Sequence, residues 1–175
     1  DKTGTITQPE MAYCGMLPLA TQVTEAQLEK LLSDFVSNME PDNETMQALQ
    51  KSLRSDTARK ALQVLGFSSE TKYSAVSYGG QESYVLGAPE FILGAEATLP
   101  TAPWLRKPWP TQPGTALCRL PAWPQRTGYL LSLPLAFVLL RNPVRENAKE
   151  TFAYFHAQGV TVKVISGDNL SPFPQ

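Results

Sequence analysis

The first seven residues hold the densest group of side chains that could do phosphoryl chemistry. They read Asp1-Lys2-Thr3-Gly4-Thr5-Ile6-Thr7. A carboxylate such as that of Asp1 can attack the terminal phosphoryl group of ATP and hold it as an acyl phosphate. That reaction depends on positioning and charge neutralisation, which the Thr3 hydroxyl, a close backbone approach at Gly4 and a bound Mg²⁺ would provide. The pattern predicts a phosphate-accepting carboxylate, and an Asp that only caps a turn is the alternative.

A second polar group lies near the other end of the chain. Ser166-Gly167-Asp168-Asn169 directly follows residues 160–165, which read Val-Thr-Val-Lys-Val-Ile. In open α/β sheets, ligands bind beyond the carboxyl ends of the strands. By itself a Ser-Gly-Asp sequence is often only a turn, but its place after an expected strand makes it a candidate for the same site as Asp1.

Length, charge and composition restrict what the chain can be. Its 175 residues suffice for one ordinary domain or two small ones. The formal net charge of −1 gives no basic excess that would point to nucleic acid. Two cysteines, Cys14 and Cys118, make neither a disulfide framework nor a metal site. No stretch approaches the ~20 apolar residues of a membrane span. Because residue 1 is Asp and not Met, we expect the chain to begin inside a longer protein.

Three helices are expected in the first third of the chain. Thr24 and Gln27 form a capping-box variant, and the apolar residues after them recur every three or four positions as far as residue 39. After a turn, a second helix is expected over residues 44–53. A short third helix is expected over residues 56–62, with Asp56 as its cap.

From residue 64 the pattern changes to that of strands. Residues 73–76 and 83–86 are rich in strand-forming side chains and flank Gly79-Gly80, which is typical of a hairpin turn. Pro89 is expected in the first turn of a short helix that follows this hairpin.

The region after residue 128 has the pattern of a strand, a helix and a second strand. Residues 133–140 form an apolar run of strand length, suited to a sheet buried on both faces. A helix is expected over residues 146–158, with His156 on its surface and Gly159 as its C-cap, and residues 160–165 form the next strand. This order predicts a parallel sheet with a right-handed crossover.

These motifs resemble those of the cation-transporting P-type ATPases. Their phosphorylation motif matches residues 1–7, and their Thr-Gly-Asp motif, shared with the haloacid dehalogenase superfamily, is similar to residues 166–168. Residues 87–90, Gly-Ala-Pro-Glu, are similar to a third family motif. The resemblance covers roughly residues 1–97 and 129–169.

The resemblance implies an α/β fold. A Rossmann-like haloacid-dehalogenase phosphorylation domain, present in part, would carry an inserted α+β nucleotide-binding domain. Residues 1–18 and 129–175 would belong to the phosphorylation domain, and residues 19–128 to the nucleotide-binding domain.

The resemblance also implies roles for single residues in phosphoryl transfer. Asp1 would accept the phosphoryl group, Lys2 and Thr3 would complete the catalytic motif, and Asp1 and Thr3 would hold Mg²⁺. Ser166 would hydrogen-bond a phosphoryl oxygen beside Gly167, and Asp168 would lie near the phosphate and the Mg²⁺.

Other residues are implied to bind the nucleotide. Phe67 would stack on adenine, Lys72 would reach the nucleotide and Glu44 would contact the adenine amino group. Gly87 and Arg145 complete the set of residues implied to bind the nucleotide or its phosphates. Without a ligand, Phe67 would be an ordinary core residue, and Glu44 and Lys72 ordinary surface charges. The chain departs from the family at Leu86, where the family has Lys, and at Asn142, where it has Asp; the first change removes one cation near the nucleotide.

Two segments fit none of these patterns. Residues 100–126 hold all three tryptophans and seven of the fifteen prolines, without helical or strand periodicity. One interpretation is a proline-rich interaction loop. The interpretation we prefer is that part of this segment, together with residues 170–175, is translated in another reading frame, because a shifted frame can give an amphipathic helix and a strand. As written, the segment is expected to lack both elements, and Arg119 is not assumed to replace the family's Arg near the ATP phosphates.

The function implied is that of part of an ATP-driven cation pump. It would use ATP and Mg²⁺, form an aspartyl-phosphate on Asp1, and act with actuator and transmembrane domains expected elsewhere in the same chain. The transported cation would be its partner, and nucleic acid would not. The parent is expected in a membrane, with a bacterial plasma membrane favoured and this part facing the cytoplasm. The chain alone is expected not to turn over ATP.

Two other classes stay open. A soluble haloacid-dehalogenase-type phosphatase would usually carry a second Asp where Thr3 stands, to act as acid and base. A non-catalytic nucleotide-binding or interaction module is favoured by Leu86, Asn142 and the segment rich in Pro and Trp.

Overall fold

The computed structural model of the chain describes residues 6–8, 10–80, 82–93, 115–121 and 132–163. The chain divides into two compact units. The larger is Tyr13–Leu140, and the smaller combines Asp1–Ala12 with Arg141–Gln175. Within the described ranges, no helix has the length and apolar character needed to cross a membrane.

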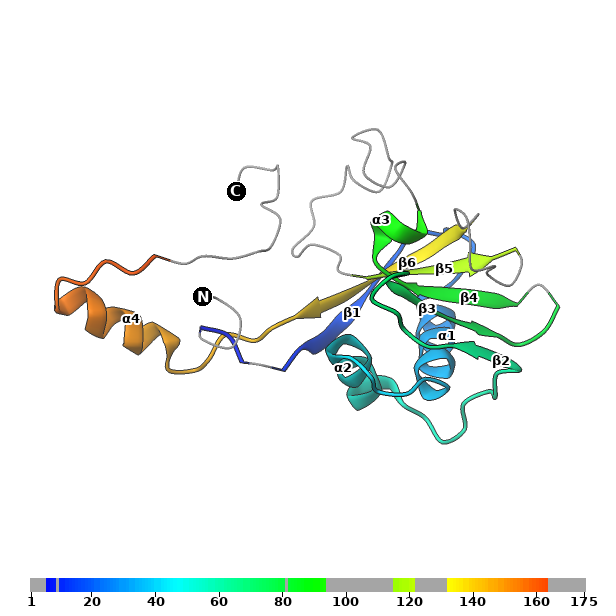
Figure 1. Ribbon diagram of the computed structural model, residues 1–175, viewed down its shortest axis with the longest axis horizontal. Helices are drawn as coiled ribbons and strands as arrows, with labels where there is room; N and C mark the ends of the chain where they lie inside the picture. Colours follow the sequence, from blue (N-terminus) through cyan, green and yellow to red (C-terminus); the bar gives the residue numbers. More distant parts are fainter. Residues whose placement is uncertain (1–5, 9, 81, 94–114, 122–131, 164–175) are drawn as a thin grey trace. The chain divides into compact units, whose positions relative to one another are not determined.

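A six-stranded sheet forms the centre of the larger unit (Figure 1). The order across the sheet is β1-β6-β5-β4-β3-β2. The pairs that join β2 to β3, β3 to β4, β4 to β5 and β5 to β6 are all antiparallel. The strands are β1 (Ala12–Pro18), β2 (Gln63–Leu65), β3 (Tyr73–Ser77), β4 (Ser83–Gly87), β5 (Thr115–Leu120) and β6 (Leu133–Arg141).

Residues 133–140 form part of β6, which runs antiparallel to β5. The parallel pairing predicted between this strand and residues 160–165 is not formed by residues 160–163, and residues 164–165 lie outside the described residues. The predicted burial on both faces of a sheet is confirmed for the centre of the run, where Leu135, Ala136, Phe137 and Val138 are all buried, but not for its start, where Leu133 is 63% exposed. The run carries no information about the direction of the neighbouring strand.

Side chains of the sheet alternate between two hydrophobic clusters. One face packs against helices α1 (Glu25–Ser37) and α2 (Glu44–Leu53) and includes Leu86, whereas the other includes Val85 and Ile92 of the short helix α3 (Pro89–Ile92). Figure 1 shows α1 and α2 on one side of the sheet and α3 on the other. Neighbouring residues of β4 therefore face opposite layers, as the pleat requires.

The helices predicted over residues 24–39 and 44–53 are confirmed as α1 and α2. The Gln27 N–H donates to Thr24 Oγ1 at 3.3 Å, and the Thr24 N–H donates to Gln27 Oε1 at 2.9 Å. This reciprocal pair is the predicted capping box. At α2, the Met46 N–H donates to Asn43 Oδ1 at 2.9 Å.

The helix predicted over residues 56–62 is wrong. Only a turn forms at Asp56-Thr57, and the chain that follows is bonded to side chains of α1. Asn38 Nδ2 donates to Arg59 O at 2.7 Å, the Arg59 N–H donates to Asp34 Oδ1 at 3.0 Å, and the Ala61 N–H donates to Asn38 Oδ1 at 2.9 Å. Because these backbone groups already have partners on α1, they do not need helical hydrogen bonds.

The expectation that residues 100–126 supply no strand is also wrong. β5 is an inner strand of the sheet, paired with β4 and β6, and its first four residues are buried. The amino-acid sequence as it stands therefore forms a strand over residues 115–120. Residues 100–114, 122–126 and 170–175 lie outside the described residues, so the helix expected from a shifted frame does too.

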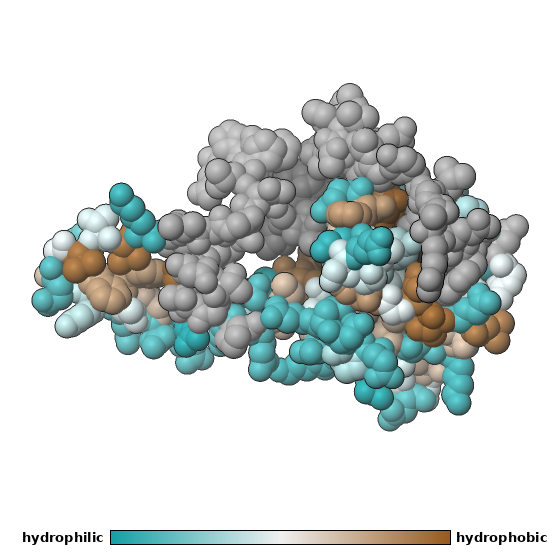
Figure 2. Space-filling model, in the orientation of Figure 1, coloured by the Kyte–Doolittle hydropathy of each residue, from teal (hydrophilic) through white to brown (hydrophobic). Residues whose placement is uncertain are grey.

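The smaller unit contains one described helix, α4 (Ala148–Ala157), which confirms the helix predicted over residues 146–158. His156 lies on its exposed surface, and Gly159 follows it with a φ of 71°. The strand predicted over residues 160–165 is wrong for residues 160–163, which form no strand. Val160 and Val162 are 50% and 42% exposed, so these valines are not held in a sheet. Figure 2 shows hydrophobic surface in the region of α4.

Candidate functional site

Four residues expected to bind nucleotide lie in the larger unit, and the structure describes all of them. Glu44 is the exposed first residue of α2. Phe67 follows β2 and is 39% exposed, so it is not a core residue. Lys72 is half-buried directly before β3, and Gly87 is the last residue of β4.

The structure brings the surroundings of Glu44 and Phe67 together. A Cβ atom placed on Gly66 would lie 4.0 Å from Asp42 Oδ2. Asp42 stands two residues before Glu44, and Gly66 one residue before Phe67. The turn that starts α2 and the loop that follows β2 are therefore neighbours, and an exposed aromatic ring and an exposed carboxylate lie on adjoining segments.

Lys72 and Gly87 are also in direct contact. The register pairs Tyr73 with Gly87. The Ala88 N–H donates to the Lys72 carbonyl at 3.0 Å, and the Lys72 N–H donates to Ser68 O at 2.7 Å. The loop that carries Phe67 and Lys72 is thus fixed to the end of β4.

Leu86 occupies the position at which the resembled family has a lysine. Its side chain is 3% exposed and belongs to the cluster between the sheet and helices α1 and α2. A lysine ammonium there would lose its hydration among the apolar side chains of that cluster. The apolar Leu86 fits its surroundings. The basic residue beside Gly87 is Lys72, which directly precedes the residue paired with Gly87.

Arg145 lies in the smaller unit. Its N–H donates to Ile6 O at 2.9 Å, and its Nε donates to Thr7 O at 3.2 Å. These bonds join the last two residues of the motif at residues 1–7 to the segment that precedes α4. Arg145 and Lys163 both line a hollow of about 280 Å³ beside α4, so two cations border the same space.

The other expected site residues lie outside the described residues: Asp1, Lys2, Thr3, Ser166, Gly167 and Asp168. This includes both residues expected to hold Mg²⁺. In the part of the chain that the structure describes, no three His, Cys, Asp or Glu side chains are grouped so that they could hold a metal ion.

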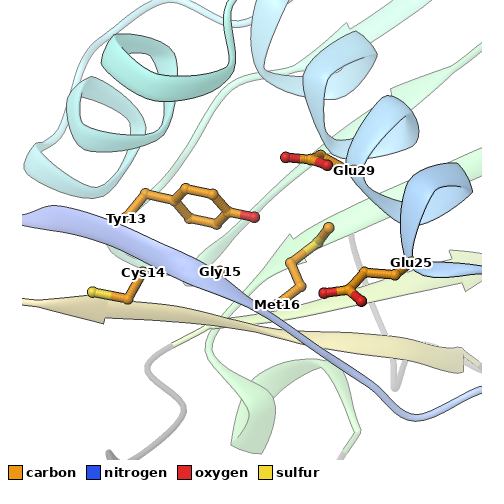
Figure 3. A pocket seen from close by; sticks show the side chains of 6 residues that line it. All are labelled: Tyr13, Cys14, Gly15, Met16, Glu25 and Glu29. Carbon is orange, nitrogen blue, oxygen red and sulfur yellow. The ribbon is translucent and has the colours of Figure 1, made fainter.

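A different hollow of the larger unit is unsuited to a nucleotide. It measures about 290 Å³, and Tyr13, Met16, Glu25 and Glu29 are among its lining residues (Figure 3). Burial raises the pKa of the Tyr13 hydroxyl, and the negative charges of Glu29 and Glu25 raise this pKa further. The same charges would repel the phosphates of a nucleotide.

Sequence reasoning missed Asp42 and Gly66 as neighbours of the site. Asp42 was recognisable only as part of a turn before α2. Its approach to Gly66 links segments about twenty residues apart, which no local pattern reports.

No protein-family model matches the chain. The probable cation-transporting ATPase exp7 of Streptococcus pneumoniae is 33% identical over 175 aligned residues, which cover 97% of this chain and 22% of that protein. The calcium-transporting ATPase CtpE of Mycobacterium bovis is 32% identical over 175 residues, covering 97% and 21%. The CtpE protein of Mycolicibacterium smegmatis is 33% identical over 175 residues, with the same coverage of 97% and 21%. The chain thus spans about a fifth of the length of these relatives.

Solved structures of the same kind share the fold. A zinc-transporting PIB-type ATPase in its E2.Pi state has a TM-score of 0.60 at 19% identity, covering 97% of this chain and 25% of that one. The catalytic domain of the CPx-ATPase CopB-B has a TM-score of 0.54 at 13% identity, covering 97% and 52%. In sequence the chain is therefore similar to one segment of cation-transporting ATPases, and it shares its fold with solved structures of a PIB-type ATPase and a CPx-ATPase.

Proposed function

We propose that this chain is the ATP-binding and phosphate-accepting segment of an ATP-driven cation pump. The larger unit would bind ATP, and Asp1 would accept its terminal phosphoryl group as an aspartyl-phosphate. The parent would be a membrane protein, with actuator and membrane-spanning domains elsewhere in its chain and this segment facing the cytoplasm. Alone, the segment would not sustain ATP turnover.

One observation carries the nucleotide site. The loop between β2 and β3 presents an exposed Phe67 and ends at Lys72, and it lies against the turn that begins α2 at Glu44. An aromatic face can stack on a base, an ammonium can neutralise phosphate charge and a carboxylate can accept from an exocyclic amine. All three chemistries are present on adjoining segments of one unit.

The same loop contains two features that are unfavourable without a function. Lys72 has a φ of 60°, and among the described residues it is the only one other than glycine with a positive φ. The Thr71 hydroxyl oxygen is buried and has no hydrogen-bond partner in the described part of the chain. Such features concentrate at ligand sites, where the surrounding structure maintains them.

The phosphoryl-transfer half of the proposal rests on the motifs. Asp1 would be the nucleophile, with Lys2 and Thr3 beside it, and Ser166, Gly167 and Asp168 would bind the transferred group. Asp1 and Thr3 would hold Mg²⁺, which would neutralise the charge on the phosphates. Arg145, which is bonded to Ile6 and Thr7, supports the proposal because it attaches a cation to the last two residues of the motif.

Binding of ATP to the full chain, measured by isothermal titration calorimetry, tests the proposal. Phe67→Ala should weaken ATP binding at least about fivefold, because stacking of a base on an aromatic ring contributes about 1 to 3 kcal/mol. Phe155→Ala is the matched control: Phe155 is also 39% exposed but lies on α4 in the smaller unit. Equal effects of the two substitutions, or no binding by the unmodified chain, would contradict the proposal.

A further inference from the structure

Gly87 is a glycine whose own backbone conformation does not require one. Gly15, Gly79, Gly80 and Gly159 have positive φ angles, a region that favours glycine, but Gly87 does not. The reason for glycine at this position must therefore lie in what surrounds it.

The surroundings leave no space for a side chain. A Cβ atom on Gly87 would lie 2.4 Å from Lys72 O, 2.5 Å from Tyr73 Cβ and 2.6 Å from Tyr73 Cα. Two of these three atoms belong to the backbone, so they cannot move aside as the end of a flexible side chain can. Any side chain at Gly87 would push the backbone at Lys72 and Tyr73 away from β4.

Lys72 is the residue most sensitive to such a displacement. Its left-handed φ of 60° is unfavourable for a residue with a Cβ atom, so its neighbours must hold it. Two backbone hydrogen bonds fix Lys72 in the described structure: its N–H donates to Ser68 O, and the Ala88 N–H donates to Lys72 O. Ala88 directly follows Gly87, so the second bond forms only while Gly87 stays close to Lys72.

We propose that Gly87 is a positioning residue for Lys72. The missing side chain lets the end of β4 lie against the Lys72 carbonyl, and this contact sets the left-handed backbone from which the ammonium group reaches the phosphates of ATP. Gly87 then acts through Lys72 and not by contact with the nucleotide. This inference rests on the proposed ATP site.

A double-mutant cycle on the full chain tests the inference, with ATP and adenosine as the two probes in calorimetry. Lys72→Met should weaken ATP binding about fivefold and leave adenosine binding unchanged, because adenosine has no phosphate for the ammonium to contact. Gly87→Ala should produce the same selective loss. The double variant should bind ATP no more weakly than Lys72→Met alone, because both substitutions remove one interaction.

Two further variants separate positioning from loss of stability. Gly80→Ala strains the hairpin turn at a φ of 59° but has open space around it, so it should lower the melting temperature and keep the ATP affinity. Ala88→Pro removes the N–H that holds Lys72 O, at a φ of −62° that proline can adopt. It should reproduce the selective loss of ATP affinity if Gly87→Ala does not fold.

Additive losses in the cycle would overturn the inference, because Gly87 would then act independently of Lys72. So would an unchanged ATP affinity in Gly87→Ala or Ala88→Pro, or an equal loss of adenosine binding. If the unmodified chain binds no ATP, the proposed function fails and the inference fails with it. If the unmodified chain binds ATP and only the cycle is additive, the inference alone fails.

Discussion

Leu86 illustrates how the environment of one residue decides which chemistry its position can support. Alternation along β4 turns Leu86 toward α1 and α2, where it is 3% exposed, while Gly87 next to it contacts Lys72. The sequence showed that a lysine was missing relative to the family. Only the structure shows that position 86 is a core position, and that Lys72, directly before β3, is hydrogen-bonded to the residue after β4.

We predict that Leu86→Lys lowers the free energy of unfolding by about 3 kcal/mol or more, because it moves an ammonium group from water into an apolar cluster. Leu62→Lys is the control, since Leu62 is 74% exposed and the same change there should stay within about 0.5 kcal/mol. Urea unfolding of both variants gives the comparison. A stable Leu86→Lys variant would show that position 86 has access to solvent or to a ligand.

Tyr78 predicts a dependence of stability on high pH. Burial, followed by the charge of Asp34, raises the pKa of its hydroxyl to about 12. The folded state thus keeps its proton where the unfolded chain, with a pKa near 10, loses it. Stability from this group is complete below pH 10 and is lost as the pH rises toward 12.

The check is urea unfolding at pH 9 and pH 11. Tyr78→Phe should reduce the loss of stability between these two pH values. Tyr154→Phe, at a side chain that is 64% exposed, should not. An unchanged pH dependence in Tyr78→Phe would mean that the hydroxyl titrates at its usual pKa.

Among the elements, those with strong local patterns were predictable from the sequence. The capping box at Thr24 and the cap at Asn43 fix the starts of α1 and α2, and Gly79-Gly80 fixes the hairpin of β3 and β4. β5 was missed because its six residues stand between segments rich in Pro and Trp. Its place in the sheet depends on pairing with β4 and β6, which are about thirty and fifteen residues away.

The segment after α2 shows why a local signal can mislead. Asp56 is a good helix cap, but the carboxyl-terminal part of α1 offers better partners to the chain that follows. In addition to the bonds from Asp34 and Asn38, Ser33 Oγ donates to Leu53 O at 2.6 Å, and the Ser55 N–H donates to Ser37 Oγ at 3.0 Å. Polar side chains at the end of α1 therefore bind the backbone of the segment that follows α2, and this segment does not form the predicted helix.

We predict that Asn38→Ala lowers the free energy of unfolding by about 2 to 3 kcal/mol, because the side chain makes three hydrogen bonds, to Asp34 O, Arg59 O and the Ala61 N–H. Gln47→Ala is the control, because Gln47 is exposed on α2 and its Nε2 donates a hydrogen bond to Pro41 O at 3.1 Å. That change should stay within about 0.5 kcal/mol. Equal effects in thermal or urea unfolding would refute the anchoring role of Asn38.

At the scale of the whole molecule, the chain is two units with different shares of the proposed chemistry. The larger contains Glu44, Phe67, Lys72 and Gly87, and the smaller contains Arg145 and both phosphate motifs. The motifs were recognisable from the sequence because each is short and continuous. The proposed nucleotide site could be only partly predicted, because its residues are spread over more than forty positions and depend on the approach of the loop before β3 to the turn before α2.

The most direct test of this account is the mapping of ATP on the isotopically labelled full chain by amide chemical-shift changes in NMR. The account predicts saturable shifts at Glu44, Phe67, Lys72 and Gly87, with Glu25 and Glu29 unaffected. Saturable shifts centred on the hollow beside Tyr13, or no saturable shift anywhere in the larger unit, would contradict it.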